Sequence, residues 1–297
     1  MATETEFHFI DVFARRPLEG NPLTLVPDAD HLDVATMRAI AREFNQSETT
    51  FLVQPTSAAH WRLRSFTPTG VEVLGAGHNA LGAWLWLAHA QRLPRSTSPT
   101  RLIQQIGDRL LPVEVAEDAD GRTVVRMEQS APVFGPELTD RRQLAAALNI
   151  NVADLSDEPA EVVSTGAAHL LVPLRSREAV DRADPDGQRL SSVLRTVTEE
   201  GCYLYSLDPV DAAGGSIAYA RFFNPTAGIS EDPATGTAAG PLAARLVRDG
   251  RHDAGTAAII EQGHRLGRPS RLQVTLSGET VVLSGAGVVV ASGRLHL

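Results

Sequence analysis

The sequence predicts an α+β protein made of two similar halves, each wrapping a largely antiparallel sheet or barrel around one central helix. Residues 79–91 and 237–248 are rich in Ala and Leu and apolar on nearly every side, which is typical of buried helices. Each follows a glycine turn, and the turn glycines Gly77 and Gly236 are 159 residues apart, about half of the 297-residue chain. Alternating or β-branched runs predict strands at residues 7–13, 61–66, 123–127, 169–173, 216–223, 271–276 and 281–290.

The boundary between the halves is expected near the middle of the chain. Residues 128–136 contain two Pro and one Gly and are predicted to form a linker. We therefore expect an N-terminal domain over residues 1–130 and a C-terminal domain over residues 131–297, with the last strand able to pack back on the first domain. Two surface helices are predicted as well, at residues 33–44 with Asp33 as N-cap and at residues 141–148.

Composition limits the classes of function. The formal net charge is −9, and this balance opposes a nucleic-acid partner, because binding to a phosphate backbone requires a basic face. No apolar run approaches the roughly 18 residues that span a membrane, and residues 1–6 lack the basic and apolar regions of a signal peptide. We expect a cytoplasmic protein with no membrane partner. The single cysteine, Cys202, excludes an internal disulfide and lies in a predicted buried strand, where it is expected to be a core residue.

The starts of the two buried helices are candidate binding sites. A helix N-terminus carries unsatisfied N–H donors and a partial positive charge, so it attracts a carboxylate or a phosphate. His78 begins the first helix and Asp232 directly precedes the second turn, in matching places of the two halves. The alternative is that the glycines only make tight turns, that His78 is structural, and that Asp232 is a turn residue before proline.

Glu48 is the third candidate. It follows the predicted helix at residues 33–44 and enters a strand. A carboxylate beside apolar neighbours can have a raised pKa and can then transfer protons. The alternative for Glu48 taken alone is a solvated loop acid or a capping residue.

Several common signatures are absent from the sequence. No third glycine follows Gly75-Ala76-Gly77 at the spacing of a dinucleotide-binding turn, and neither a P-loop nor a Gly-x-Ser-x-Gly elbow occurs. The nine histidines form no pair with metal-ligand spacing beside a carboxylate. We expect neither a metal nor a cofactor.

Five motifs, in order along the chain, resemble the phenazine-biosynthesis (PhzF-like) family. They are LEGNPL at residues 18–23, IAREFNQSETTF at 40–51, RSFTP at 64–68 followed by Gly77-His78, EDPATGTAAGPL at 231–242, and QG at 262–263 with GRPS at 267–270. The resemblance covers essentially the whole chain.

This resemblance implies the fold of diaminopimelate epimerase: two pseudo-symmetric domains, each a curved sheet around a central helix, with the active site between them. The epimerases use one cysteine from each glycine turn as base and acid. The matching places here hold Gly77 and Asp232, so two-cysteine epimerisation is excluded. The family implies a cofactor-independent, homodimeric isomerase that moves a proton on a small carboxylate-bearing cyclic amino or hydroxy acid. Its best-understood members act on trans-2,3-dihydro-3-hydroxyanthranilate.

The resemblance also assigns roles to individual residues. Glu48 would take the proton from C3 of the ring and return it at a conjugated position, His78 would contact the substrate and help steer the proton, and Asp232 would hold the amino or hydroxyl group. The turn amides and the hydroxyl around Gly77, Gly236 and Thr237 would bind the carboxylate. Further substrate contacts are expected from Ser47 and Asn79.

Three departures from the family pattern touch the expected cleft. Asn79-Ala80 replaces the usual Pro or other small residue after Gly77-His78, the stretch from Pro68 to Gly77 is one residue longer, and Thr237 stands where serine is commoner. Asn79 is either a new contact or a residue tolerated at a helix start. Two alternatives stay open: an isomerase or epimerase of another secondary-metabolite intermediate, and a small-anion-binding protein without catalysis.

Overall fold

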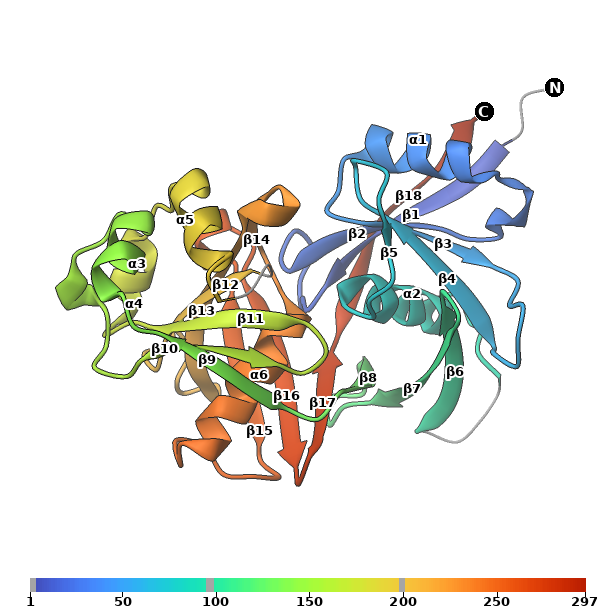
Figure 1. The fold of residues 1–297 in the computed structure, drawn as a ribbon. Helices are drawn as coiled ribbons and strands as arrows, with labels where there is room; N and C mark the ends of the chain where they lie inside the picture. Colours follow the sequence, from blue (N-terminus) through green and yellow to red (C-terminus); the bar gives the residue numbers. More distant parts are fainter. Residues whose placement is uncertain (1–3, 95–98, 198–200) are drawn as a thin grey trace. The chain divides into compact units, whose positions relative to one another are not determined.

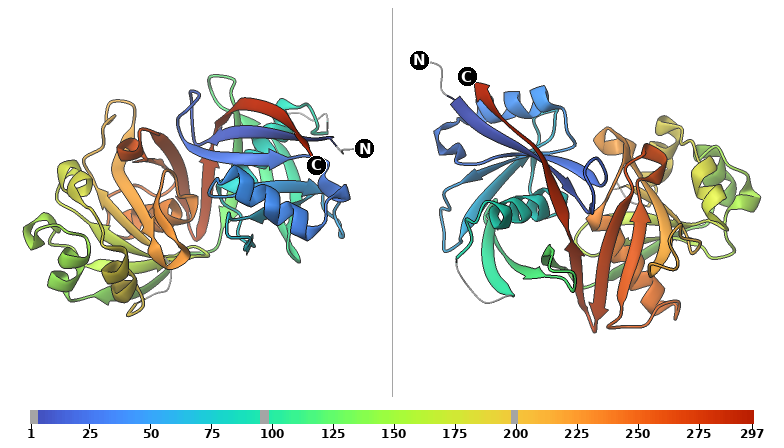
Figure 2. Two further views of the ribbon diagram at one scale, coloured as in Figure 1. Left: turned by 90° about the horizontal axis from the view of Figure 1, so that it is seen from above. Right: turned by 180° about the vertical axis from the view of Figure 1, so that it is seen from behind.

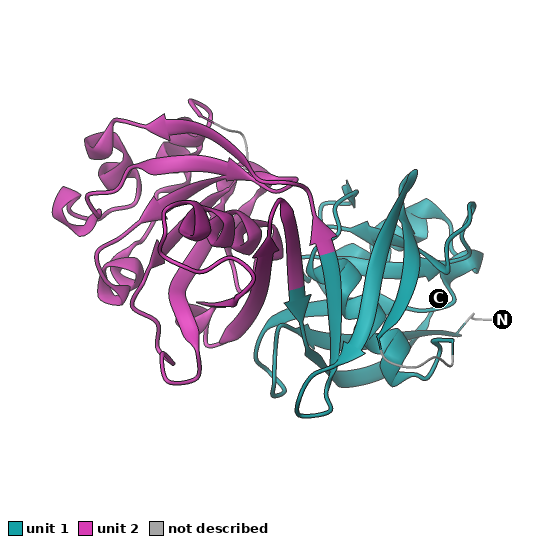
Figure 3. Cartoon of the chain, turned by 90° about the horizontal axis from the view of Figure 1, so that it is seen from below, with its two compact units in different colours: residues 1–127, 284–297 teal, residues 128–283 magenta. Residues whose placement is uncertain are grey.

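The computed structural model describes residues 4–94, 99–197 and 201–297, and the chain forms two compact units (Figure 3). Unit 1 contains Met1–Met127 and Ser284–Leu297, and unit 2 contains Glu128–Leu283. The chain leaves unit 1 within strand β8 and returns to it within strand β17. The boundary expected from sequence falls just after the first crossing, and residues 284–297 of the expected second domain lie in unit 1. No helix within the described residues is long and apolar enough to cross a membrane.

Unit 1 is a curved sheet that surrounds helix α2 (His78–His89), with helix α1 (Val34–Phe44) on its surface (Figure 1). Its strands are β1 (Glu4–Val12), β2 (Asn21–Val26), β3 (Thr49–Val53), β4 (Trp61–Phe66), β5 (Glu72–Val73), β6 (Thr100–Ile106), β7 (Arg109–Glu117), β8 (Thr123–Gln129) and β18 (Gly287–His296). Pairing is antiparallel except for β2 with β3 and β4 with β6. Strand β18 lies beside β1, which brings the two ends of the described chain together (Figure 2).

Helix α2 is buried on nearly every side, as the sequence predicts. The indole N–H of Trp84 donates to Gln104 Oε1 at 2.9 Å, so the one polar atom of this buried ring has a partner. A Cβ at Gly82 would lie 2.6 Å from the Leu23 side chain, so glycine lets α2 approach β2 closely. The predicted N-cap of α1 is confirmed, because the Asp33 carboxylate accepts a hydrogen bond from the Thr36 amide at 2.8 Å.

Unit 2 wraps a second curved sheet against helix α6 (Gly236–Arg248) (Figure 1). Its strands are β9 (Val133–Leu138), β10 (Ala160–Ser164), β11 (Ala168–Pro173), β12 (Cys202–Ser206), β13 (Ser216–Asn224), β14 (Ile229–Asp232), β15 (Ala257–Gln262), β16 (Ser270–Ser277) and β17 (Thr280–Gly285). Three shorter helices are α3 (Arg141–Ala147), α4 (Arg177–Arg182) and α5 (Gly187–Leu194). Helices α4 and α5 are not predicted from the sequence.

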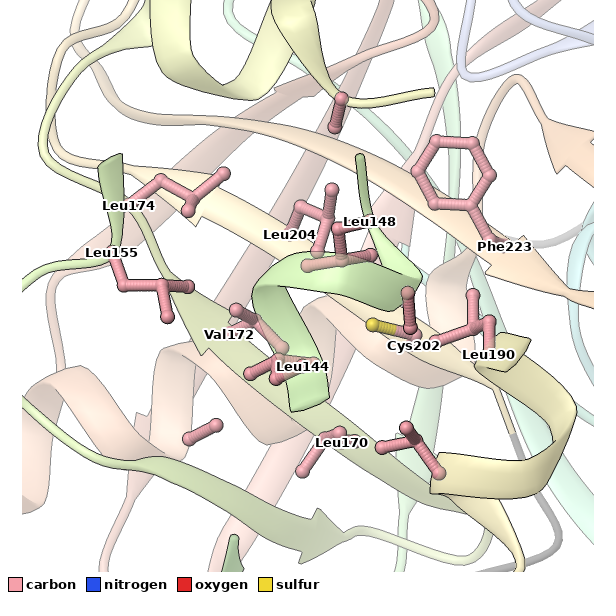
Figure 4. Packing of buried hydrophobic residues seen from close by; sticks show 14 of the residues in the cluster. Leu144, Leu148, Leu155, Leu170, Val172, Leu174, Leu190, Cys202, Leu204 and Phe223 are labelled. Atoms are coloured by element: carbon pink, nitrogen blue, oxygen red, sulfur yellow. The ribbon is translucent and has the colours of Figure 1, made fainter. Parts of the chain in front are cut away.

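Helices α3, α4 and α5 cover an apolar cluster of unit 2 (Figure 4). Leu144 of α3, Leu148 directly after this helix and Leu190 of α5 pack against Leu170 and Cys202 of the sheet. Cys202 has no exposed surface, and burial raises the pKa of its thiol. The predicted role of this residue in the core is therefore confirmed.

The two units repeat one topology. Strands β1 to β8 of unit 1 correspond in order to β10 to β17 of unit 2, and the parallel pairs β11–β12 and β13–β15 match β2–β3 and β4–β6. The register repeats as well: Thr49 at the start of β3 is opposite Phe66, and Cys202 at the start of β12 is opposite Phe223. The predicted pair of similar halves around central helices is confirmed.

Two local predictions need correction. The expected linker at residues 128–136 begins at the boundary between the units, but most of it is strand. It contains the end of β8 and the start of β9, which pairs with β10 through an irregular register near Gly135 and Pro136. Proline is tolerated at such an irregularity, because the missing N–H need not enter the ladder. The single strand expected at residues 281–290 is two strands separated at Ala286, whose carbonyl accepts a hydrogen bond from the Phe13 amide at 2.8 Å.

Candidate active site

Glu48 lies in a short segment that links helix α1 to strand β3. The helix ends at Asn45, whose φ of 51° is left-handed, as is common for a residue that terminates a helix. Two residues follow before Glu48, and Thr49 then enters the sheet between β2 and β4. Glu48 is partly buried. The chain on both sides of Glu48, the predicted proton-transfer residue, is therefore held in place: by the end of α1 on one side and by the paired start of β3 on the other.

Asn79 organises the glycine turn of unit 1. Its Oδ1 accepts a hydrogen bond from the Gly77 amide at 2.7 Å, and its Nδ2 donates to the Gly75 carbonyl at 3.0 Å and to Ser65 Oγ at 3.1 Å. Only 1% of Asn79 is exposed. Both N–H bonds of its side chain and the Gly77 N–H are thus used inside the unit, which gives Asn79 a structural role in the turn.

His78 begins α2 and contacts the segment that carries Glu48. Its Nε2 lies 3.3 Å from Ser47 Oγ, and the Ser47 hydroxyl donates to Asn21 Oδ1 at 3.3 Å. Burial lowers the pKa of His78 to about 4, so the ring is neutral near pH 7. Because the Ser47 proton goes to Asn21, the His78 Nε2 serves as the donor toward Ser47. The structure therefore brings Ser47, His78 and the backbone next to Glu48 into one place in unit 1.

Gln262 organises the corresponding turn of unit 2. Its Nε2 donates to the Asp232 carbonyl at 2.7 Å and to Thr235 Oγ1 at 3.1 Å, while its Oε1 accepts from the Thr235 amide at 3.1 Å and from the Tyr203 hydroxyl at 3.0 Å. The Thr235 hydroxyl in turn donates to Asp232 Oδ2 at 2.5 Å. Asp232 is buried, and these hydrogen bonds hold its backbone carbonyl and one oxygen of its carboxylate.

The start of α6 is held by side chains from the surrounding sheet. Gln129 Nε2 donates to the Gly236 carbonyl at 2.9 Å, and its Oε1 accepts from the Thr165 hydroxyl at 2.8 Å. His169, on β11, places its Nε2 3.1 Å from Thr237 Oγ1. The structure thus groups the predicted Asp232, Gly236 and Thr237 in one turn of unit 2.

Four residues that build these turns have no role predicted from the sequence: Asn21, Gln129, His169 and Gln262. The signal that could have identified Gln262 is the pair of polar residues, Glu261 and Gln262, that ends the apolar run of residues 257–260. Its burial requires hydrogen-bond partners, and the turn supplies them. The partners of His169 and Gln129 are distant in sequence, so no local pattern reveals them.

Each unit also carries an Arg–Glu pair next to its turn. In unit 1, Arg64 donates through Nε and Nη2 to the two oxygens of Glu72, both at 2.8 Å, and this hydrogen bonding lowers the pKa of Glu72. In unit 2, Arg221 binds Glu231 in the same way at 2.9 and 2.8 Å. Such bidentate pairs fix both side chains. Over the described ranges, no group of three or more His, Cys, Asp or Glu side chains is placed to hold a metal ion.

Comparison of the sequence with known proteins identifies the family of the chain. The model of the family described as phenazine biosynthesis-like protein (PhzC-PhzF) matches residues 10–293. The chain belongs to this family. A relative of this PhzF-family chain, the trans-2,3-dihydro-3-hydroxyanthranilate isomerase of Pseudomonas chlororaphis, is 34% identical over 293 residues, which cover 97% of this chain and 98% of the relative.

Solved structures agree with this membership. A PhzF-family phenazine biosynthesis protein of Bacillus anthracis has a TM-score of 0.90 at 27% identity, covering 99% of this chain and 100% of that one. A hydroxyproline epimerase of Agrobacterium vitis has a TM-score of 0.67 at 10% identity, covering 98% and 91%, which is a likeness of fold alone. The PhzF-family chain has the diaminopimelate epimerase-like fold that its motifs imply, and it is an isomerase.

Proposed function

We propose that this isomerase moves a proton on a small cyclic amino or hydroxy acid without a cofactor, with Glu48 as general acid and base and trans-2,3-dihydro-3-hydroxyanthranilate as substrate. The observation that carries the proposal is the position of Glu48 directly after Ser47, the hydroxyl partner of neutral His78, in a chain 34% identical to an enzyme named for that substrate. A carboxylate held at a fixed segment between a helix and a strand suits a base that must meet one C–H bond.

The proposed reaction balances without a co-reactant. The Glu48 carboxylate takes the C3 proton of the ring, and the electron pair of the broken C–H bond enters the conjugated system. The resulting Glu48 carboxylic acid returns the proton to another carbon of that system, so substrate and product have the same composition. One carboxyl group performs both transfers if the proton stays on one face of the ring. Neutral His78 contacts the substrate without adding a second charge near Glu48.

Unit 2 supplies the proposed binding groups. The buried carboxylate of Asp232 holds the amino or hydroxyl group of the substrate, and the start of α6 at Gly236 and Thr237 holds its carboxylate. In unit 1, Ser47 lines the site beside His78. Gly77 and Asn79 contribute through the shape of the turn, because the Gly77 N–H is bonded to the Asn79 side chain.

The test is to incubate the protein with trans-2,3-dihydro-3-hydroxyanthranilate in D₂O and to follow the ring protons by NMR. Wild-type protein should remove the C3 proton signal, and Glu48→Gln should lower that rate by about 10²–10⁴-fold while still binding the substrate. Glu43→Gln, an exposed acid on α1, is the matched control and should keep the wild-type rate. An unchanged rate in Glu48→Gln would remove this residue from the mechanism, and substrate binding without any proton loss in the wild type would support an anion-binding protein.

A further inference from the structure

His169 is a buried histidine of unit 2 for which the proposed reaction has no role. Only 2% of it is exposed, and its ring stands edge-on to Phe222 with centroids 5.1 Å apart and an interplanar angle of 89°. Its Nε2 is 3.1 Å from Thr237 Oγ1, whereas its buried Nδ1 has no hydrogen-bond partner within the described part of the chain. Burial also lowers its pKa to about 4, so the ring is neutral and carries one proton.

The missing partner of Nδ1 decides which nitrogen carries that proton. With the proton on Nδ1, a buried N–H donor would have no acceptor, and such orphaned donors are rarer in proteins than acceptors with an unused lone pair. With the proton on Nε2, the His169 ring donates to Thr237 Oγ1 and leaves only a lone pair unused. The second arrangement is favoured, and it makes the Thr237 oxygen an acceptor from His169.

The hydroxyl proton of Thr237 is then available to another acceptor. The other histidine–hydroxyl pair, His78 and Ser47 in unit 1, behaves differently, because the Ser47 hydroxyl donates to Asn21. His169 is the single hydrogen-bond partner of the Thr237 hydroxyl within the residues that the structure describes. Thr237 also lies in the first turn of α6, where the backbone N–H groups and the helix dipole favour an anion.

We propose that His169 is a positioning residue that fixes the Thr237 hydroxyl as a hydrogen-bond donor to the carboxylate of the substrate. This inference rests on the proposed function. Thr237 touches the ligand, and His169 acts through Thr237 by occupying its oxygen from the side of the sheet. The edge-on packing of Phe222 keeps the imidazole in the orientation that this contact requires.

The test uses binding of anthranilate, a stable aromatic amino acid that needs no turnover, measured by isothermal titration calorimetry on the whole protein. His169→Leu and Thr237→Val should each weaken anthranilate binding by about tenfold, the loss expected for one hydrogen bond to a charged group. The double variant should be no weaker than either single one, because both changes remove the same interaction. His169→Gln keeps an N–H donor at a similar distance and should retain most of the anthranilate affinity. The ligand 2-aminobenzamide lacks the carboxylate, so all variants should bind it with similar affinity.

Several outcomes would overturn the assignment. The first is a double variant whose loss of anthranilate affinity is the product of the two single losses, and the second is an unaltered affinity in His169→Leu. The third is a loss of affinity for 2-aminobenzamide as large as that for anthranilate. The fourth is failure of the wild-type protein to bind anthranilate at millimolar concentration. Circular dichroism and thermal melting identify a misfolded variant, in which case His169→Gln and Thr237→Val carry the test. Turnover adds a separate readout, since His169→Leu should raise KM more than it lowers kcat. Anthranilate binding does not require proton transfer by Glu48, so the two proposals can fail independently.

Discussion

Glu48 of unit 1 and Gly201 of unit 2 occupy the same place in the repeated topology. Glu48 directly precedes Thr49 at the start of β3, and Gly201 directly precedes Cys202 at the start of β12. In both units the strand that begins there runs parallel to the preceding strand and antiparallel to the following one. One unit therefore presents a carboxylate where the other presents no side chain at all.

The reason for the glycine is steric. A Cβ at Gly201 would lie 2.2 Å from the ring of Phe222 and 2.9 Å from the Phe223 carbonyl oxygen. The Phe222 ring takes this space and packs edge-on against His169, the proposed positioning residue. The repeated scaffold therefore carries different groups at this position: a carboxylate in unit 1, which the proposed function uses for proton transfer, and a ring packed on a buried histidine in unit 2.

The largest expected difference between the units concerns their Arg–Glu pairs. The Arg221 side chain is 6% exposed and also donates to the Val180 and Ala183 carbonyls at 3.0 and 2.7 Å, near the end of α4. Replacement by Met would leave the Glu231 carboxylate, which is only 11% exposed, without its cation. We expect Arg221→Met to lower the free energy of unfolding by about 3–5 kcal/mol, measured by urea denaturation.

Arg64→Met is the matched variant in unit 1. The Arg64 and Glu72 side chains are 19% and 29% exposed, so water can solvate the remaining carboxylate. The expected loss is about 1 kcal/mol, near the upper end for exposed pairs. Equal losses in the two variants would show that the carbonyl contacts of Arg221 add nothing, and would break the contrast between the units.

The two buried histidines give the second prediction, which concerns pH. The folded-state pKa of His78 and of His169 is about 4, below the ordinary value of 6.5, because burial disfavours the charged ring. Between pH 6.5 and 4 the unfolded chain binds more protons, so stability is fully present above pH 6.5 and falls as the pH drops toward 4. Each histidine should lower the free energy of unfolding by about 2 kcal/mol when the pH falls from 7 to 5.

Urea denaturation at pH 7 and pH 5 checks this expectation. His78→Gln and His169→Gln should each lose about 2 kcal/mol less than the wild type on acidification. His89→Gln, at the exposed end of α2, is the control and should follow the wild type. If His78→Gln or His169→Gln loses as much unfolding free energy between pH 7 and pH 5 as the wild type, the histidine that it replaces can be protonated in the folded protein.

Much of this architecture is encoded locally and is predictable from sequence. Uniformly apolar segments after glycine turns identify α2 and α6, and Asp33 identifies the start of α1. Helix α5 also carries a usable signal, because Asp186 caps it and Leu190, Val193 and Leu194 follow at helical spacing, whereas α4 has only six residues.

The partners inside the turns could not be predicted in this way. Gln262 is 27 residues from Thr235, and His169 is 68 residues from Thr237, so their contacts depend on strand pairing that the sequence pattern leaves open. Asn79 is the instructive case. The residue type and its place at a helix start suggest either a ligand contact or a tolerated substitution, and only its hydrogen bonds to Gly75 and Gly77 reveal a structural role.

The last expected effect is the most direct test of the comparison between Glu48 and Gly201. Gly201→Ala should lower the free energy of unfolding by about 1–3 kcal/mol, because the added methyl group must displace a buried ring. It should also weaken anthranilate binding, since movement of Phe222 releases His169. Gly187→Ala at the start of α5, where a Cβ meets its nearest neighbour at an ordinary 3.7 Å, is the control and should be neutral or slightly stabilising. If Gly201→Ala keeps full stability and affinity, sterics do not explain the glycine, and the absence of a carboxylate in unit 2 needs another cause.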